Sequence, residues 1–92
     1  MADVVVTLNI MPDSPSEDLK KIEIACLAKI KAFTGIDNHK IEIQPVAFGL
    51  KMLKILFVMA ESKGSTDALE ADIATIKGVA SVEVSDVRRA IG

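Results

Sequence analysis

Ile43-Gln-Pro-Val-Ala-Phe-Gly-Leu-Lys51 joins two runs of residues that both have the alternating pattern of a β-strand. The first run covers residues 39–46, and Pro45 marks it as an edge strand or the end of a strand, because proline donates no ladder hydrogen bond. The second run begins at Leu50 or Lys51 and is apolar on both faces, which is typical of a central strand. Two successive strands in the middle of the chain therefore decide the fold class.

The connection between these strands contains more than a turn requires. Phe48 is one of only three aromatic residues in the chain, and Gly49 follows it. An aromatic side chain beside a glycine, between two strands, favours a segment that is presented to a partner. The alternative is that Phe48 seals the end of the hydrophobic core, and the residue pattern alone leaves both interpretations open.

Before this hairpin, the sequence predicts a strand and then a helix. Residues 3–11 alternate as a strand, which Pro12 ends. Ser14-Pro-Ser-Glu17 predicts the helix start, with Ser14 as the N-cap of a capping box and a proline at the first helical position. The helix is expected to run to about residue 33. Its apolar stripe has the spacing of a buried helix face: Leu19, Ile22, Cys26, Ile30 and Phe33.

After the hairpin, the sequence predicts a second helix and a last strand. The helix covers residues 66–77, with Ser65 or Thr66 as its cap. Its buried stripe is Leu69, Ile73 and Ile76. The last strand starts at Val82 and continues through Val87, before a tail of residues 88–92.

The resulting order over residues 1–92 is β-α-β-β-α-β, which predicts a single domain with the α+β ferredoxin-like sandwich. Right-handed crossovers place both helices on one face of a four-stranded antiparallel sheet, with the first and third strands in the centre. The other face is expected to be open. Its apolar residues are Val5, Met52, Leu56 and Val58, which either meet a partner or are ordinary exposed apolar residues.

Composition excludes several classes of protein. The net charge of −2 lacks the basic excess that phosphate neutralisation requires, so no direct binding of nucleic acid is expected. No apolar run approaches the length of a membrane span, and the first residues show no signal peptide. A lone cysteine, Cys26, forms no intramolecular disulfide framework and favours a reducing compartment. We therefore expect a cytoplasmic protein.

The chain also lacks the residues of the common catalytic and ligand sites. One cysteine and one histidine, Cys26 and His39, cannot build the first shell of a zinc site. There is no glycine-rich phosphate loop, and no histidine is assignable as a base for Ser14 or Ser16. RNA-binding sheets of this topology stack bases on strand aromatics, whereas Phe57 is expected to point toward the helices. We expect no catalytic residues, no metal and no cofactor.

Two features remain as candidate partner-binding sites. The first is the segment Pro45–Lys51, with Phe48 at its apex. The second is the basic pair Arg88-Arg89 near the end of the chain, for which a solvated pair of charges is the simpler interpretation.

A family resemblance supplies what spacing does not. The run Ile43-Gln-Pro-Val-Ala-Phe-Gly-Leu-Lys-Met-Leu53 resembles the motif of the translation elongation factor 1 beta family. The ending Val82-Glu-Val-Ser-Asp-Val-Arg-Arg89 is similar to the archaeal branch of that family. So are Asp3-Val-Val-Val-Thr7, Met11-Pro-Asp-Ser14 and Gly64-Ser-Thr-Asp-Ala-Leu-Glu70. The resemblance covers nearly the whole chain.

The resemblance implies guanine-nucleotide exchange on the GTPase elongation factor 1 alpha, without covalent chemistry. It also implies that the aromatic side chain of the Phe-Gly turn, here Phe48, inserts into the GTPase and that Gly49 allows close approach. Lys51 lies in the same segment and is expected to face the partner. In eukaryotic relatives, a lysine close to the C-terminus disturbs the magnesium site. This sequence has no such lysine, and Arg88 and Arg89 are its last basic residues.

An alternative from another class is a small-molecule-binding or self-assembling ferredoxin-like module that uses the open sheet face. The sequence does not determine the oligomeric state, and a monomer is the simpler expectation.

Overall fold

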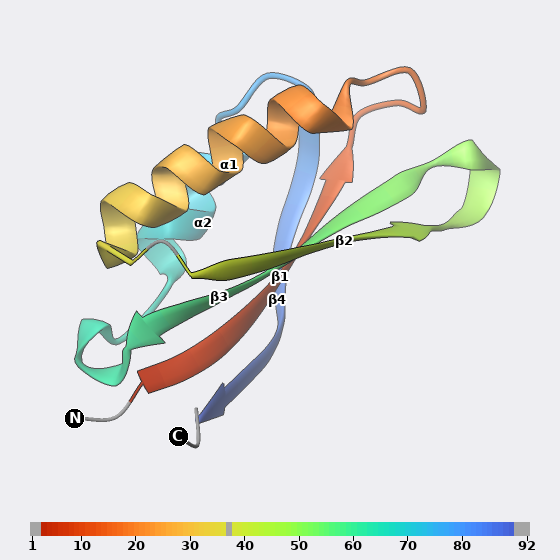
Figure 1. Cartoon of the computed structure of the whole chain (residues 1–92). Helices are drawn as coiled ribbons and strands as arrows, with labels where there is room; N and C mark the ends of the chain where they lie inside the picture. Colours follow the sequence, from red (N-terminus) through yellow and green to blue (C-terminus); the bar gives the residue numbers. More distant parts are fainter. Residues whose placement is uncertain (1–2, 37, 90–92) are drawn as a thin grey trace.

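The computed structural model describes residues 3–36 and 38–89. Its helices and strands are β1 (Asp3–Pro12), α1 (Leu19–Thr34), β2 (His39–Pro45), β3 (Lys51–Ala60), α2 (Asp67–Ala74) and β4 (Val79–Arg89), as Figure 1 shows. Two single-turn 3-10 helices, Ala47–Gly49 and Glu61–Lys63, lie at the two ends of β3. The predicted order of elements is confirmed.

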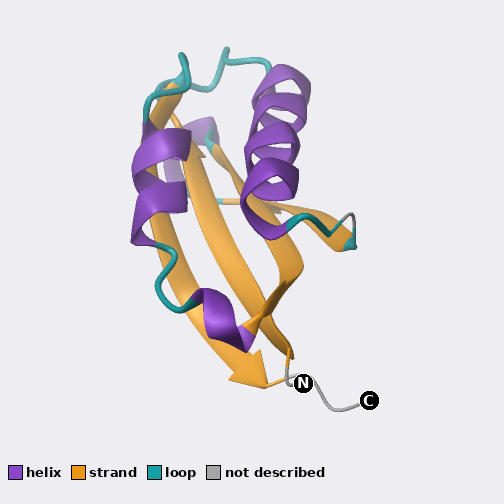
Figure 2. Cartoon of the chain, turned by 90° about the vertical axis from the view of Figure 1, so that its left-hand side faces the viewer, coloured by secondary structure: helices purple, strands orange, loops and turns teal. Residues whose placement is uncertain are grey.

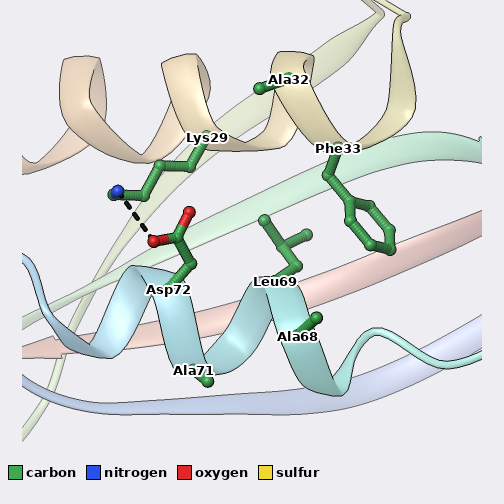
Figure 3. A pocket seen from close by; sticks show the side chains of 7 residues that line it. All are labelled: Lys29, Ala32, Phe33, Ala68, Leu69, Ala71 and Asp72. Atoms are coloured by element: carbon green, nitrogen blue, oxygen red, sulfur yellow. Dashed lines mark hydrogen bonds and ion pairs between the residues drawn. The ribbon is translucent and has the colours of Figure 1, made fainter.

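The four strands form one antiparallel sheet in the order β2-β3-β1-β4. The central strands are β3 and β1, as predicted, and β2, which ends at Pro45, is an edge strand. Figure 2 shows α1 and α2 on the same face of the sheet. The fold is therefore the predicted ferredoxin-like sandwich.

The hydrophobic core lies between the sheet and the two helices. Alternate residues of β1 and β3 enter it, because neighbouring side chains of a strand point to opposite faces. Its buried members are Val6, Leu8, Ile10, Ile22, Cys26, Ile30, Leu53, Ile55, Phe57, Met59, Leu69 and Ile73. The outer positions of the predicted helix stripes, Leu19, Phe33 and Ile76, are partly buried and pack against this core.

The predicted start of α1 is wrong. Asp18, and not Ser14, is the N-cap: its Oδ1 accepts hydrogen bonds from the backbone N–H groups of Lys20 at 3.0 Å and Lys21 at 3.4 Å. Residues 14–17 form a separate turn, in which the Glu17 N–H donates to the Ser14 carbonyl at 3.2 Å. The carboxylate of Asp18 fits the same capping role as a serine, so the pattern contained two candidate caps one turn apart.

The ends of α2 and β4 also differ from the predicted ones. α2 ends at Ala74, because the next two N–H groups donate to carbonyls three residues back, as in a 3-10 turn. The Thr75 N–H donates to the Asp72 carbonyl at 3.2 Å, and the Ile76 N–H donates to the Ile73 carbonyl at 3.0 Å. The chain then enters β4 at residue 79, earlier than predicted. β4 also continues two residues further and includes Arg88 and Arg89, which were predicted to lie in a tail.

The thiol of Cys26 is buried in the core under α1. Burial raises the pKa of this thiol to about 12, and the nearby Lys29 ammonium acts in the opposite direction. The thiolate is the reactive form of cysteine. A thiol with a raised pKa therefore stays protonated and unreactive at neutral pH.

We predict that a soluble alkylating reagent modifies Cys26 at least about a hundredfold more slowly in the native protein than in the denatured chain. In the native protein the reagent cannot reach the buried sulfur, and the sulfur stays in its unreactive thiol form. Mass spectrometry of time points at pH 8, with and without denaturant, measures both rates. Comparable rates would contradict the burial of this thiol.

The face of the sheet opposite the helices carries the predicted apolar residues. Val5, Met52, Leu56 and Val58 are each partly buried by their neighbours in the sheet. A shallow hollow of about 190 Å³ on this face is lined mainly by Val5, Leu56, Val58 and the start of β2. This face remains the alternative binding surface.

Candidate partner-binding site at the hairpin tip

β2 and β3 form a hairpin that extends away from the two helices, as the green segment of Figure 1 shows. The last paired residues are Pro45 and Lys51. Beyond them, the Val46 N–H donates to the Leu50 carbonyl at 2.9 Å, and the Leu50 N–H donates to the Ala47 carbonyl at 3.3 Å. These two bonds close a compact tip, so the segment has a defined shape.

Phe48 occupies the tip in a left-handed backbone conformation, with φ 62° and ψ 30°. It is the one non-glycine residue with positive φ among residues 3–36 and 38–89. For a bulky L-residue this conformation costs roughly 1–2 kcal/mol, and such strain tends to be found at functional sites.

The side chain of Phe48 is 93% exposed and leaves its aromatic surface in water. The interpretation that Phe48 seals the core is therefore wrong. An exposed aromatic ring on a backbone that is already fixed is suited to insertion into a partner, because little further ordering is required on binding.

Gly49 also has a positive φ, 75°. A Cβ atom built on Gly49 would have no neighbour within 4 Å, so glycine is needed here for its backbone conformation and not for packing within the chain. The space around it leaves the backbone open to close approach from outside.

A hollow of about 310 Å³ separates the base of the tip from the β1–α1 connection. Gly49 and Lys51 line it on the hairpin side, and the opposite side carries charged residues that include Glu17, Asp18 and Lys20. Sequence reasoning treated residues 12–18 only as a strand end and a helix cap and missed their proximity to the tip. Nothing in the spacing shows this proximity, since it depends on how far the hairpin extends past the end of β1.

The structure does not bring the predicted site residues together. Phe48, Gly49 and Lys51 lie beyond the last pair of β1 with β3, Ile10 with Leu53, and Lys51 is the first residue of β3. The other two predicted residues, Arg88 and Arg89, belong to β4 and pair with the opposite end of β1. Along β1, the six residue steps from residue 4 to residue 10 span about 20 Å. The arginine pair and the hairpin tip are therefore separated by about half or more of the 42 Å length of the molecule.

The end of β4 lies beside the start of β1 (Figure 1), where Arg88 pairs with Val5 and Arg89 pairs with Val4. Arg88 Nε lies 2.6 Å from an Asp86 carboxylate oxygen, and Arg89 Nη2 lies 3.0 Å from Glu61 Oε1. Both arginine side chains are mostly exposed. Exposed ion pairs of this kind contribute little stability, so both guanidinium groups are available for exchange onto another anion.

Other kinds of site are not formed by the described residues. No three His, Cys, Asp or Glu side chains gather there as metal ligands do. Within that part of the chain, no helix has the length and apolar character needed to cross a membrane. His39 is the first residue of β2, and the thiol of Cys26 is buried in the core.

Comparison with known proteins places these features in a family. Residues 5–90 match the family described as the EF-1 guanine nucleotide exchange domain. Over 89 residues, the chain is 40% identical to elongation factor 1-beta of Methanothermobacter thermautotrophicus and 43% identical to that of Methanobrevibacter smithii. Each alignment covers 97% of this chain and 98% of the relative. The chain therefore belongs to the EF-1 guanine nucleotide exchange domain family, with elongation factor 1-beta proteins of archaea as its relatives.

Proposed function

We propose that this chain accelerates the exchange of GDP for GTP on elongation factor 1 alpha by inserting the hairpin tip into that GTPase. The observation that carries the proposal is the conformation of Phe48, an aromatic side chain that is 93% exposed on a strained, hydrogen-bonded tip. Family membership supplies the kind of partner. The chain itself performs no covalent chemistry in this function, and we place it in the cytoplasm, where its partner acts.

An exchange factor acts through a difference in affinity. If the chain binds the nucleotide-free GTPase more tightly than the nucleotide-bound form, nucleotide binding is weakened by the same factor, because the two equilibria are linked. A preformed tip suits this role, since burying the ring of Phe48 in a pocket that opens only without nucleotide favours the nucleotide-free form by about 1.5–3 kcal/mol. Gly49 lets the partner backbone approach the tip.

The distance between the hairpin tip and the arginine pair determines how large the contact surface with the GTPase has to be. Phe48 and the pair Arg88-Arg89 lie at opposite ends of the sheet. One GTPase can touch both only if its contact surface runs along the length of the exchange domain. We propose that the tip supplies the wedge and that the arginines supply a separate, electrostatic contact.

The test of the function is the release of a fluorescent GDP analogue from the cognate GTPase, followed by stopped flow with and without the chain. The proposal requires that release becomes faster as the concentration of the chain rises, up to a plateau. Release that stays at its spontaneous rate at saturating chain, with a folded GTPase, would refute it.

The same assay tests whether Arg88 and Arg89 contribute to nucleotide exchange. Arg88→Ala and Arg89→Ala are each expected to slow exchange severalfold at low ionic strength, with a difference that shrinks as salt screens the contact. Lys40→Ala is the matched control, because Lys40 is also an exposed cation within 3.7 Å of a carboxylate. Arginine variants that behave like this control at low salt would return Arg88 and Arg89 to the role of solvated charges.

A further inference from the structure

β4 forms the second edge of the sheet, because the strand order is β2-β3-β1-β4. Within the described residues, no strand pairs with its outer side. An edge strand presents unpaired N–H and C=O groups, which can pair with another strand. The other edge, β2, is short and ends in Pro45, whereas β4 has 11 residues and contains no proline. β4 is therefore the longer of the two edges and carries no proline, although its charged residues and its bulge limit the registers in which another strand can pair.

A bulge interrupts the pairing of β4 with β1. Thr7 pairs with Asp86, and the next residue, Leu8, pairs with Val84. Ser85 is therefore the extra residue of the bulge. A bulge of this kind shifts the alternation of side chains by one residue.

The shift determines which residues of β4 share a face. Before the bulge, Val84 packs against the core on the helix side, and Glu83 lies on the open side of the sheet. After the bulge, Val87 pairs with a core residue and lies on the helix side, and Arg88 lies on the open side. Each side of Ser85 thus has one valine on the helix side and one charged residue of this set on the open side. Their order is mirrored: Glu83 and Val84 come before Ser85, and Val87 and Arg88 come after it.

We propose that β4 pairs in antiparallel orientation with β4 of a second copy of this chain, about a two-fold axis that passes between Ser85 and Asp86. In this register Glu83 lies opposite Arg88 of the second copy, on the open side. Val84 lies opposite Val87 of the second copy, on the helix side. Each pair occurs twice, as a two-fold interface requires.

Charge and face together select this register. With the axis on Ser85, Val84 would lie opposite Asp86, and these two side chains point to opposite faces of the sheet. With the axis between Val84 and Ser85, Glu83 would lie opposite Asp86, which places two carboxylates together. Among two-fold axes from Val84 to Asp86, only the axis between Ser85 and Asp86 gives partners that share a face and have opposite charge, and such cross-strand pairs stabilise a sheet.

The interface also covers a surface that is otherwise exposed. Val87 is 55% exposed and borders an apolar hollow of about 210 Å³ with Val4, Val6 and Met59. In the dimer, Val84 of the second copy lies beside Val87 at the edge of this hollow. Arg88 keeps its contact with Asp86 of its own chain, and Glu83 of the second copy adds a second carboxylate to the same guanidinium group.

The dimer has a consequence for the rest of the molecule. Joining the two β4 edges gives one continuous eight-stranded sheet, with β2 at both outer edges and both Phe48 tips free. The ends that carry Arg88 and Arg89 are covered instead. The monomer is then the form in which both regions are accessible, and the proportion of monomer falls as the concentration rises.

The test is sedimentation velocity of the full chain from micromolar to millimolar concentration, on the wild type and three variants. The wild type is expected to shift from monomer to dimer over this range. Glu83→Arg and Arg88→Glu each turn two attractive pairs into repulsive ones and are expected to raise the dissociation constant of the dimer about tenfold or more. The double variant E83R/R88E restores both pairs with exchanged signs and is expected to recover the wild-type constant within about threefold.

Glu42→Arg is the matched control, because Glu42 is an exposed glutamate on the other edge strand. It is expected to leave the dissociation constant unchanged, and circular dichroism checks that every variant is folded. A wild type that stays monomeric at millimolar concentration would overturn the proposal. So would single variants that dimerise like the wild type, or a double variant that is no better than the single ones. These results do not depend on the exchange assay.

Discussion

Phe48→Ala is expected to reduce the acceleration of GDP release by tenfold to a hundredfold at subsaturating chain. The ring is 93% exposed in the free protein, so its contribution is made only on contact with the partner. Burying one aromatic side chain contributes about 1.5–3 kcal/mol, and each 1.4 kcal/mol corresponds to a factor of about ten in affinity. Aromatic anchors of this kind commonly dominate an interface.

The same substitution is expected to leave the fold intact. Phe48 makes no contribution to the core, so its removal changes the free energy of unfolding by less than about 0.5 kcal/mol, as for most exposed positions. Ile24→Ala is the matched control, since Ile24 is an exposed apolar residue, 59% accessible, on the outer face of α1. Stopped-flow release with both variants separates a specific wedge from a general loss of apolar surface, because a wedge requires that only Phe48→Ala slows exchange.

Phe57→Ala is expected to have the opposite profile, a large loss of stability. Phe57 is 1% exposed and is the largest of the fully buried side chains in the described residues. Truncating a buried phenylalanine to alanine costs about 3–5 kcal/mol, through lost burial and the cavity that remains. A domain of this size has a total stability of about 5–15 kcal/mol, so much of it is lost.

Denaturant unfolding followed by circular dichroism measures this change. Phe57→Leu keeps most of the volume and is expected to lose less than about 1.5 kcal/mol, which provides a measurable variant if the alanine variant does not fold. A loss below about 1 kcal/mol for Phe57→Ala would contradict the position of this residue in the core. Phe48 and Phe57 thus form a pair of identical residues in one hairpin with opposite expected effects.

The strand pattern and the order of elements could be predicted from the sequence, because both depend on local alternation. Leu53, Ile55, Phe57 and Met59 recur at every second position, and this period alone places them on one face of β3. The central position of β3 followed from its apolar residues on both faces. Such patterns predict structure well because burying the apolar face of a strand directly stabilises the folded state.

The ends of the helices could not be fixed in this way. Ser14 and Asp18 are both competent N-caps, and the choice depends on tertiary contacts of the connecting turn, where the Glu17 carboxylate lies against Gly78. Similarly, nothing local extends β4 through Arg88 and Arg89, since their place in the sheet depends on pairing with β1. These boundaries are set by neighbours distant in the sequence.

The candidate site was predictable only in part. A phenylalanine beside a glycine between two strands marked the tip, but its exposure depends on how far the hairpin extends beyond β1. The distance between this tip and the arginine pair follows from the sheet register, which residue spacing does not contain. The bulge at Ser85, on which the proposed dimer depends, likewise leaves no sequence signal.

Photo-crosslinking from position 48 tests most directly whether the tip faces the GTPase. A benzoylphenylalanine in place of Phe48 keeps an aromatic ring at the tip and reacts with what it touches. We predict a one-to-one adduct with nucleotide-free elongation factor 1 alpha, and a reduced yield when excess GDP is present. Intact exchange activity with no adduct from position 48 would contradict it.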